Sequence, residues 1–290
     1  MRTVKHKTIL IAAICTIIFV CSCAVVGEKS KIKVGEEKIP IGLKRKTRVE
    51  YSATATGKVK LENKVVNIFD IIGNEIEWSW YDADGSLIQR SVSKHDKDGN
   101  EIERIYINKN GDFECKWVLE YDGNGYGITG YRYDIKEHLT RKRTSKYDVK
   151  GKMVDRAYYK ADGSLDERWI SKYDDYGKKV ESAKYKGDNN LNSKYTFRYD
   201  ENGNMIEMCR YNKDEVLDKK YAYEYNNNAN RTEESEYRAD GSLVYKTSYN
   251  YKYNNYGNII EKNEYKVKIV DGRETKTLIR QTLYEYEFYK

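Results

Sequence analysis

The sequence predicts an all-β protein built from repeated hairpins. Glycines recur at a constant interval of 26 residues. They are Gly73, Gly99, Gly125, Gly151, Gly177 and Gly203. A fixed period of this length is typical of repeat proteins, in which each unit buries its face against its neighbours. The chain also has 29 tyrosines and one proline, a composition that suits half-buried strands. We therefore expect an antiparallel β-meander of two-strand repeats, forming an open, twisted or coiled sheet.

The N-terminus has the features of an export signal, predicted for residues 1–22. A basic segment, Met1–Lys7, precedes an apolar segment, Thr8–Val20, that is short for a membrane-spanning helix. Residues 20–23, Val-Cys-Ser-Cys, resemble a bacterial lipobox and point to Cys23 as the lipidated residue. An uncleaved anchor or an ordinary signal peptide is the alternative. We expect a protein of the bacterial cell envelope, attached by lipid to the outer membrane or cell surface.

The mature chain is predicted to have two parts. Residues 23–50 show no period and are polar and basic, as expected of a tether between the lipid and a folded domain. Residues 51–290 form the predicted hairpin-repeat domain.

Each period is expected to hold two strands and two turns. After Gly203, residues 204–211 alternate as a strand, residues 212–215 turn, and residues 217–225 return. Gly203 fits the left-handed position of a type I turn with a G1 bulge. The second turn, Asp-Gly-Ser in several repeats, changes at Glu137, Asn189 and Glu215. We expect about sixteen strands, with residues 284–288 forming an exposed edge that Glu285 and Glu287 protect.

Aligned repeats give columns of one residue type. A leucine column opens the return strands, and tyrosines end both strands of most repeats, so one Tyr/Leu-rich face is expected to be partly sheltered. A basic column and an acidic column accompany them. The basic one comprises Arg90, Lys116, Lys142, Arg168, Lys194, Lys220 and Lys246, and the acidic one Glu77, Glu103, Asp155, Glu181, Glu207, Glu233 and Glu261. We interpret them as an ion-pair ladder; a linear recognition track is the alternative.

Two cysteines lie in the predicted domain. Cys115 and Cys209 fall on the fourth and eleventh predicted strands, about 34 Å apart in a flat sheet. A disulfide cannot span this distance, so both are expected to be buried small apolar residues.

Several function classes are disfavoured. The net charge of +7 falls to +4 without the predicted signal, so we expect no nucleic-acid partner. His95 and His138 have no metal-ligand motif around them, and no nucleophile or phosphate-binding motif is present. We therefore predict a protein that is not an enzyme, with no catalytic residue, metal or cofactor.

The word Tyr-x-Tyr-Asp-x-x-Gly, as at residues 197–203 (Phe-Arg-Tyr-Asp-Glu-Asn-Gly), resembles the YD repeats of the RHS family. The Asp-Gly-Ser-Leu word is similar to MORN-type hairpin repeats. The RHS resemblance implies a coiling strip of β-sheet and a role in carbohydrate or cell-surface contact, sometimes as a shell around a toxin. The asparagine after the glycine departs from the RHS pattern, and no site residue is carried over.

The leading functional expectation is a non-enzymatic envelope lipoprotein that binds a glycan or a protein. Its candidate ligand-binding residues are the tryptophans Trp78, Trp80, Trp117 and Trp169, whose rings suit sugar faces and protein hot spots. A structural or assembly role and an antitoxin-like or immunity-like partnership with a toxin are the alternatives. A specific site is expected where the period fails, at residues 125–130, at Ala229 or before Gly257.

Overall fold

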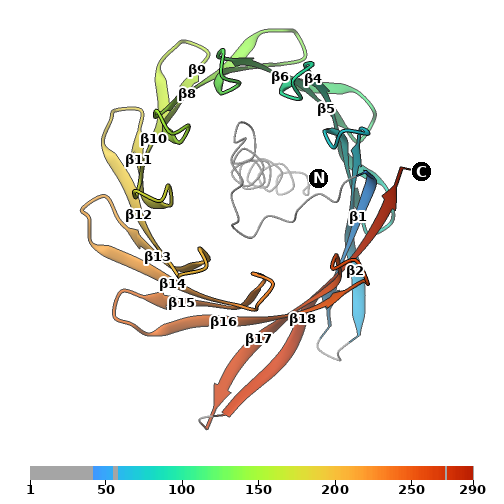
Figure 1. The fold of residues 1–290 in the computed structure, drawn as a ribbon, viewed down its shortest axis with the longest axis vertical. Coiled ribbons are helices and arrows are strands. Elements are labelled where there is room, and N and C mark those ends of the chain that lie inside the picture. The colour runs from blue at the N-terminus through green and yellow to red at the C-terminus, as the bar shows by residue number, and fades with distance from the viewer. Residues whose placement is uncertain (1–41, 55–57, 272, 290) are drawn as a thin grey trace, which may run out of the picture.

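The protein is a closed barrel of antiparallel strands. The computed structural model describes residues 42–54, 58–271 and 273–289, and these contain 18 strands in one sheet (Figure 1). The strands are β1 (Leu43–Ala53), β2 (Val59–Phe69), β3 (Glu75–Asp82), β4 (Leu87–His95), β5 (Glu101–Asn108), β6 (Phe113–Tyr121), β7 (Gly127–Tyr133), β8 (Leu139–Tyr147), β9 (Met153–Lys160), β10 (Leu165–Tyr173), β11 (Lys179–Lys186), β12 (Leu191–Tyr199), β13 (Met205–Tyr211), β14 (Leu217–Tyr225), β15 (Arg231–Arg238), β16 (Leu243–Tyr253), β17 (Ile259–Val270) and β18 (Arg273–Phe288). Consecutive strands pair throughout, so an all-β fold of repeated hairpins is confirmed.

The expectation of an open sheet with β18 at its edge is wrong. β1 pairs with β2 on one side and with β18 on the other, from Leu43 opposite Phe288 to Ser52 opposite Arg280. At the end of this seam, the backbone N–H of Tyr289 donates to the carbonyl of Gly42 at 2.9 Å. Closure satisfies two rows of backbone groups that an open sheet would leave at its edges.

The N-terminal boundary of the domain also needs correction. Residues 43–50, assigned to the tether, form most of β1, because a strand outside the repeat carries no periodic signal. The predicted signal peptide and Cys23 lie outside the described residues.

Cys115 and Cys209 form no disulfide with each other. They lie on β6 and β13, seven strands apart as expected, but the sheet between them is curved and not flat. Cys115 is buried, as predicted, whereas Cys209 is only half-buried.

The 26-residue glycines occupy the left-handed position of short turns at one end of the barrel. In the turn before β13, the N–H of Gly203 donates to the carbonyl of Asp200, and its φ is 89°. Ala229, one repeat later, keeps the same conformation with a φ of 58°. At the other end, Glu137, Asn189 and Glu215 have φ values of 61°, 62° and 58°. The strands therefore impose this turn geometry even where glycine is absent.

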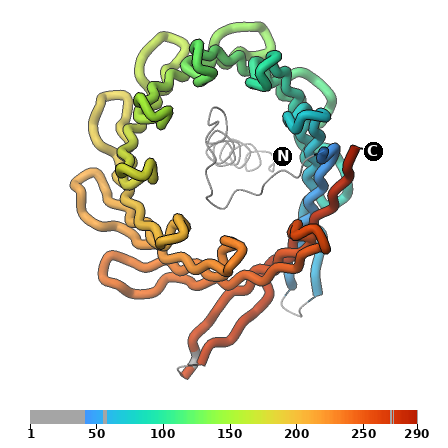
Figure 2. The backbone as a smooth tube through the Cα atoms, in the orientation of Figure 1, coloured from blue at the N-terminus to red at the C-terminus, as the bar shows by residue number. Residues whose placement is uncertain are grey.

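The short turns identify the face of the sheet that lines the barrel, here called the lumenal face. They bend toward the barrel axis, whereas the hairpins at the other end splay outward, β17–β18 furthest (Figures 1 and 2). The turn residue Tyr126 stacks on Tyr147 of β8 with ring centroids 4.7 Å apart, and Lys178 lies over the ring of Tyr199. Because side chains alternate along a strand, Arg141, Arg143 and Ser145 share the lumenal side with Tyr147. Leu139 lies beyond an irregularity in the pairing of β7 with β8 and faces outward with its partner Tyr133.

A lumenal tyrosine column fastens the two strands of each hairpin together at their open end. In each case the hydroxyl donates to a backbone carbonyl 20 residues earlier, on the preceding odd-numbered strand. These bonds join Tyr121 to Glu101, Tyr147 to Gly127, Tyr173 to Met153, Tyr199 to Lys179, Tyr225 to Met205 and Tyr251 to Arg231, at 2.7–3.2 Å. At the seam, Tyr289 makes the equivalent bond to Phe69 at 2.6 Å. The column therefore continues across the closure.

The outer face carries the other recurring columns. Acidic and basic columns alternate there as an ion-pair ladder, for example Arg90 with Glu77 at 2.5 Å and Lys94 with Glu103 at 2.6 Å. Lysines also cover outer tyrosines, such as Lys116 over Tyr133. The prediction of one sheltered Tyr/Leu-rich face is wrong: the leucines and one tyrosine column face outward, while the second tyrosine column is lumenal.

The turn geometry gives a stability prediction. Replacing Ala229 with Gly should raise the free energy of unfolding by about 0.5–1 kcal/mol, because glycine removes the left-handed strain at a small cost in unfolded-state entropy. Urea unfolding followed by circular dichroism measures the change.

Gly203→Ala is the matched control at the same turn position. A Cβ there would meet no atom closer than 3.6 Å, so the substitution tests backbone strain alone. It should destabilise by about 1 kcal/mol. Equal effects of one sign at both positions would contradict the assigned turn geometry.

Candidate ligand-binding surface on the lumenal face

All four tryptophans lie on the lumenal face. Trp78 and Trp80 are two residues apart on β3, and their strand partners Ser91 and Gln89 share their side of the sheet. Trp117 of β6 and Trp169 of β10 lie opposite Arg132 and Lys184 respectively. The structure thus places every predicted ligand-binding aromatic on one side of the wall, although they are spread over eight strands, β3–β10.

Trp78 and Trp80 form a partly exposed aromatic pair. Both are half-buried, and residues at this spacing on a strand lie roughly 7 Å apart along one face. Their cross-strand partners on β2 are Asn67 and Val65. The amides of Asn67 and Gln89 flank the two flat apolar rings. They donate to Glu75 at 2.6 Å and to Glu114 at 3.1 Å, and their carbonyl oxygens can accept from the hydroxyls of a sugar that stacks on the rings.

The other two tryptophans are held more fully by neighbouring residues. Trp117 is 5% exposed and packs within the wall. Trp169 donates from its indole N–H to Glu167 at 3.2 Å, lies under the Lys184 ammonium and stacks with Tyr195. Of the four predicted residues, Trp78 and Trp80 are the better placed for a ligand.

Lumenal positions at mid-strand differ from repeat to repeat, unlike the outer columns. The position of Trp78 becomes Arg104, Gly130, Arg156, Ser182, Met208 and Glu234 in successive repeats. The position of Trp80 becomes Tyr106, Arg132, Tyr158, Lys184, Arg210 and Glu236. The ring therefore repeats its scaffold on the outside and varies its chemistry on the inside, which is the pattern expected of a recognition surface on a repeat protein.

A basic patch, missed by the sequence analysis, occupies β7–β9. We call Arg132, Arg141, Arg143 and Arg156 the arginine patch. Arg132 and Arg141 are direct strand partners, and Arg143 lies opposite Gly130 on β7 and Tyr158 on β9. The signal that could have found it was the clustering of these four arginines on three consecutive predicted strands.

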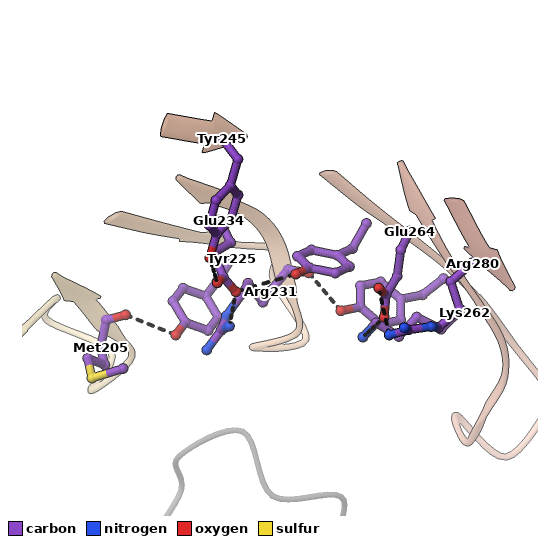
Figure 3. Close-up of polar contacts among 10 residues, drawn as sticks. Met205, Tyr225, Arg231, Glu234, Tyr245, Lys262, Glu264 and Arg280 are labelled. Atoms are coloured by element: carbon purple, nitrogen blue, oxygen red, sulfur yellow. Dashed lines mark hydrogen bonds and ion pairs between the residues drawn. The ribbon is translucent and has the colours of Figure 1, made fainter. Parts of the chain in front are cut away.

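The opposite wall carries a tyrosine and carboxylate network. Glu234 of β15 accepts from Arg231 at 2.6 Å and from the hydroxyl of Tyr245 at 2.7 Å, and Glu264 of β17 accepts from Lys262 at 2.9 Å (Figure 3). Each charge here has a partner, and the Arg231 guanidinium lies 4.2 Å from the centroid of the Tyr223 ring. This network stiffens the wall beside the seam.

The three places where the period fails have different outcomes. At residues 125–130, Gly130 provides space for Arg143: a Cβ at Gly130 would lie 3.5 Å from the guanidinium and 3.0 Å from Leu119. Ala229 keeps an ordinary turn, and the insertion before Gly257 lengthens β16. Only the first place contributes to a candidate site.

Two shallow hollows, of about 270 and 300 Å³, contain none of the tryptophans. The described residues include no group of three or more His, Cys, Asp or Glu that could hold a metal. Within the described part of the chain, no helix is long and apolar enough to cross a membrane.

The fold and the lumenal face define a closed hairpin-repeat barrel with a chemically varied inner wall. No family model and no curated protein matches the chain. Among solved structures, it is similar to a porin-like protein from Bacteroides uniformis ATCC 8492, with 12% identity, 87% of this chain and 99% of that chain covered, and a TM-score of 0.48.

Two toxin structures are also similar in part. One is TcdB2–TccC3 without its hypervariable C-terminal region, with 9% identity and a TM-score of 0.29 over 82% of this chain. The other is the Photorhabdus luminescens Tc holotoxin pore, with 11% identity and a TM-score of 0.30 over 83% of this chain. The matched part spans 16% of each toxin chain. Identity and TM-score are low in every case, so function has to be argued from the site.

The buried lumenal tyrosines predict a loss of stability at alkaline pH. Burial raises the pKa of Tyr199, Tyr251 and Tyr284 to about 12, from an ordinary value near 10. The unfolded chain ionises first, so the stability that these groups contribute is complete below pH 10 and is lost as the pH rises from 10 toward 12. Urea unfolding across this range, with phenolate absorbance recorded in parallel, measures both changes. Tyrosines that ionised near pH 10 in the folded protein would contradict this.

Proposed function

We propose that the protein is a non-enzymatic envelope lipoprotein whose barrel binds a glycan chain along its lumenal face. The observation that carries the proposal is the Trp78–Trp80 pair, set side by side on one strand and flanked by Asn67 and Gln89. Flat rings bind the apolar face of a pyranose, and amides donate to and accept from its hydroxyls. The binding surface is therefore the inner face of a closed barrel, and not the open sheet expected from the sequence.

The size of the ring supports binding on the inside. With 18 strands spaced about 4.8 Å apart and tilted by about 40°, the backbone lies roughly 18 Å from the barrel axis. Long side chains reach roughly 7 Å, so the side chains of the wall alone do not fill the interior. Barrels of about this size enclose an aqueous channel, wide enough for an extended polymer.

The outer wall supports a barrel that lies in water and is held at the membrane by its lipid. Ion pairs such as Arg168 with Asp155 and Lys220 with Glu207 occupy outer positions within the strands. A charged side chain facing hydrocarbon would cost about 2–4 kcal/mol at the bilayer midplane. Attachment through acylated Cys23 needs no contact between the wall and lipid tails.

The likeness of the turn words to YD repeats agrees with a role in surface contact. The antiparallel hairpins and the Tyr-Asp-x-x-Gly turns, as in residues 199–203, carry that likeness. A protein ligand and a purely structural role are the competing outcomes of the experiments below.

The proposal predicts that Trp78→Ala/Trp80→Ala weakens glycan binding. Each ring is expected to act as a binding hot spot, so the double variant should lose roughly tenfold to hundredfold in affinity for the best ligand of a glycan array. Isothermal titration with that ligand measures the loss.

Tyr185→Ala is the matched control, because it removes a ring from the outer face of the same wall. It should leave affinity unchanged. Unaltered binding by the double variant, with a normal circular dichroism spectrum, would refute the assigned surface. If the wild-type protein binds no glycan at all, a structural or protein-binding role gains support.

The anchor makes a separate prediction. Cys23→Ser should abolish acylation, lowering the mass by that of the lipid and moving the protein from the membrane fraction to the soluble fraction. Mass spectrometry and fractionation of intact cells test this. An unchanged mass and unchanged membrane association would rule out Cys23 as the lipidated residue.

A further inference from the structure

We infer that the arginine patch is a subsite for a negatively charged oxygen group, a carboxylate or a sulfate ester, on an acidic glycan. This inference rests on the proposed glycan-binding function and adds the chemical class of the ligand. It begins from an unusual electrostatic arrangement on β7–β9.

Arg143 is buried without a charge partner. It is 4% exposed, its Nε has no hydrogen-bond partner, and it forms no ion pair with any described residue. An isolated buried charge is strongly unfavourable, and proteins usually pair such groups or leave them in water. Tyr121 is an electrostatic neighbour of Arg143, but no carboxylate in the described chain offsets this cost.

A second arginine of the patch, Arg132, also lacks a carboxylate partner among the described residues. It is half-buried. Its direct strand partner is Arg141, and like charges placed opposite each other are destabilising. Arg141 is held by Asp166 at 2.7 Å, and Arg156 has contacts of its own. Asp166 and Glu167 both lie beside Arg141, whereas no described carboxylate pairs with Arg132 or Arg143, so these two positive charges are left unneutralised.

The backbone around Arg143 is adapted to hold it. Gly130 lies directly across the strand pair, where a Cβ would touch the guanidinium at an ordinary 3.5 Å and crowd Leu119 at 3.0 Å. The position that Gly130 occupies is taken by Arg104 one repeat earlier and by Arg156 one repeat later. Arg104 is satisfied by Glu101 and Glu75, which shows how this wall neutralises an arginine that has a structural role.

Aromatic rings lie among the arginines, which favours a sugar over a bare anion. Arg132 has Trp117 as a strand partner, Arg156 has Trp169, and Arg141 lies 4.4 Å from the centroid of the Tyr158 ring. Guanidiniums form charge-assisted, often bidentate, hydrogen bonds with carboxylates and sulfates, and the rings offer apolar faces beside them. An oligosaccharide that carries acidic groups matches both features.

The test compares two variants at adjacent positions on β8 with opposite orientations. Arg143→Met removes the lumenal charge, and Lys142→Met removes an outer-face charge from the same strand. The mature acylated protein in detergent is titrated with an oligogalacturonate and with the same oligosaccharide after reduction of its carboxyl groups. A sulfated oligosaccharide distinguishes sulfate from carboxylate as the preferred group.

We expect the wild-type protein to prefer the acidic oligosaccharide over its reduced form by roughly tenfold or more, with an affinity that falls as salt rises. Arg143→Met should lose this preference and keep or raise the midpoint of thermal unfolding, because an unpaired buried charge is removed. Lys142→Met should keep the preference. Arg132→Gln, at a half-buried position, should weaken acidic binding without affecting the neutral form.

Equal binding of acidic and reduced oligosaccharides, or an Arg143→Met protein that retains the preference, would overturn the inference. If the reduced form still binds through Trp78 and Trp80, the proposed glycan function stands and only the anion subsite fails. If no oligosaccharide binds, inorganic sulfate decides the subsite separately. It should raise the unfolding midpoint of the wild-type protein more than that of Arg143→Met, compared with chloride at equal ionic strength, and an equal shift rejects the subsite.

Discussion

The backbone pairing of β1 with β18 is the constraint on which the rest of the structure depends. Nine residue pairs join the two strands, and β1 pairs on its other side with β2. Without this seam, the hairpins would form a wide sheet with two unpaired edges, prone to pairing with other chains. With it, each hairpin has two neighbours, the sheet acquires an inside and an outside, and curvature is fixed by the number of strands. Glycine turns, tyrosine bonds and ion pairs all act within a ring that the seam has already closed.

The outer face of the ring carries structural contacts that recur, and the inner face carries residues that differ between repeats. On the outside, cations alternate with acids and cover tyrosines, so neighbouring hairpins are held in register by contacts that recur in every repeat. On the inside, only the tyrosine column near the short turns recurs, because its hydroxyls satisfy backbone carbonyls. The mid-strand lumenal positions carry tryptophan, arginine, tyrosine or glutamate without a consensus. Where a position makes no recurring structural contact, its residue type can be selected for ligand binding. This links the fold to the proposed function.

The sequence was a good guide to the parts of the fold that repeat. The 26-residue period predicted the hairpins, the antiparallel order and the turn at Gly203, because these depend on local backbone chemistry. It missed closure, because β1 carries no repeat signal and its pairing with β18 joins residues at opposite ends of the chain. The candidate site was predicted in part: the four tryptophans were named, but alternation alone could not say which face would become concave. The arginine patch was missed because the sequence prediction relied on the columns, whereas Arg132 and Arg143 lie at positions that form no column.

The contrast between Arg104 and Arg143 shows how far stability alone explains the inner wall. Both lie on the lumenal face among aromatic residues, yet Arg104 is paired with Glu101 at 2.5 Å and Arg143 with no described acid. If the interior had been shaped only for stability, Arg143 would be expected to carry a partner or to be replaced by an apolar residue of similar volume. Gly130 instead leaves room for the guanidinium, and Arg132 and Arg141 add like charge beside it. Arg132 and Arg143 thus form a sector of the inner wall that no described carboxylate neutralises, and an anionic ligand supplies the missing countercharge.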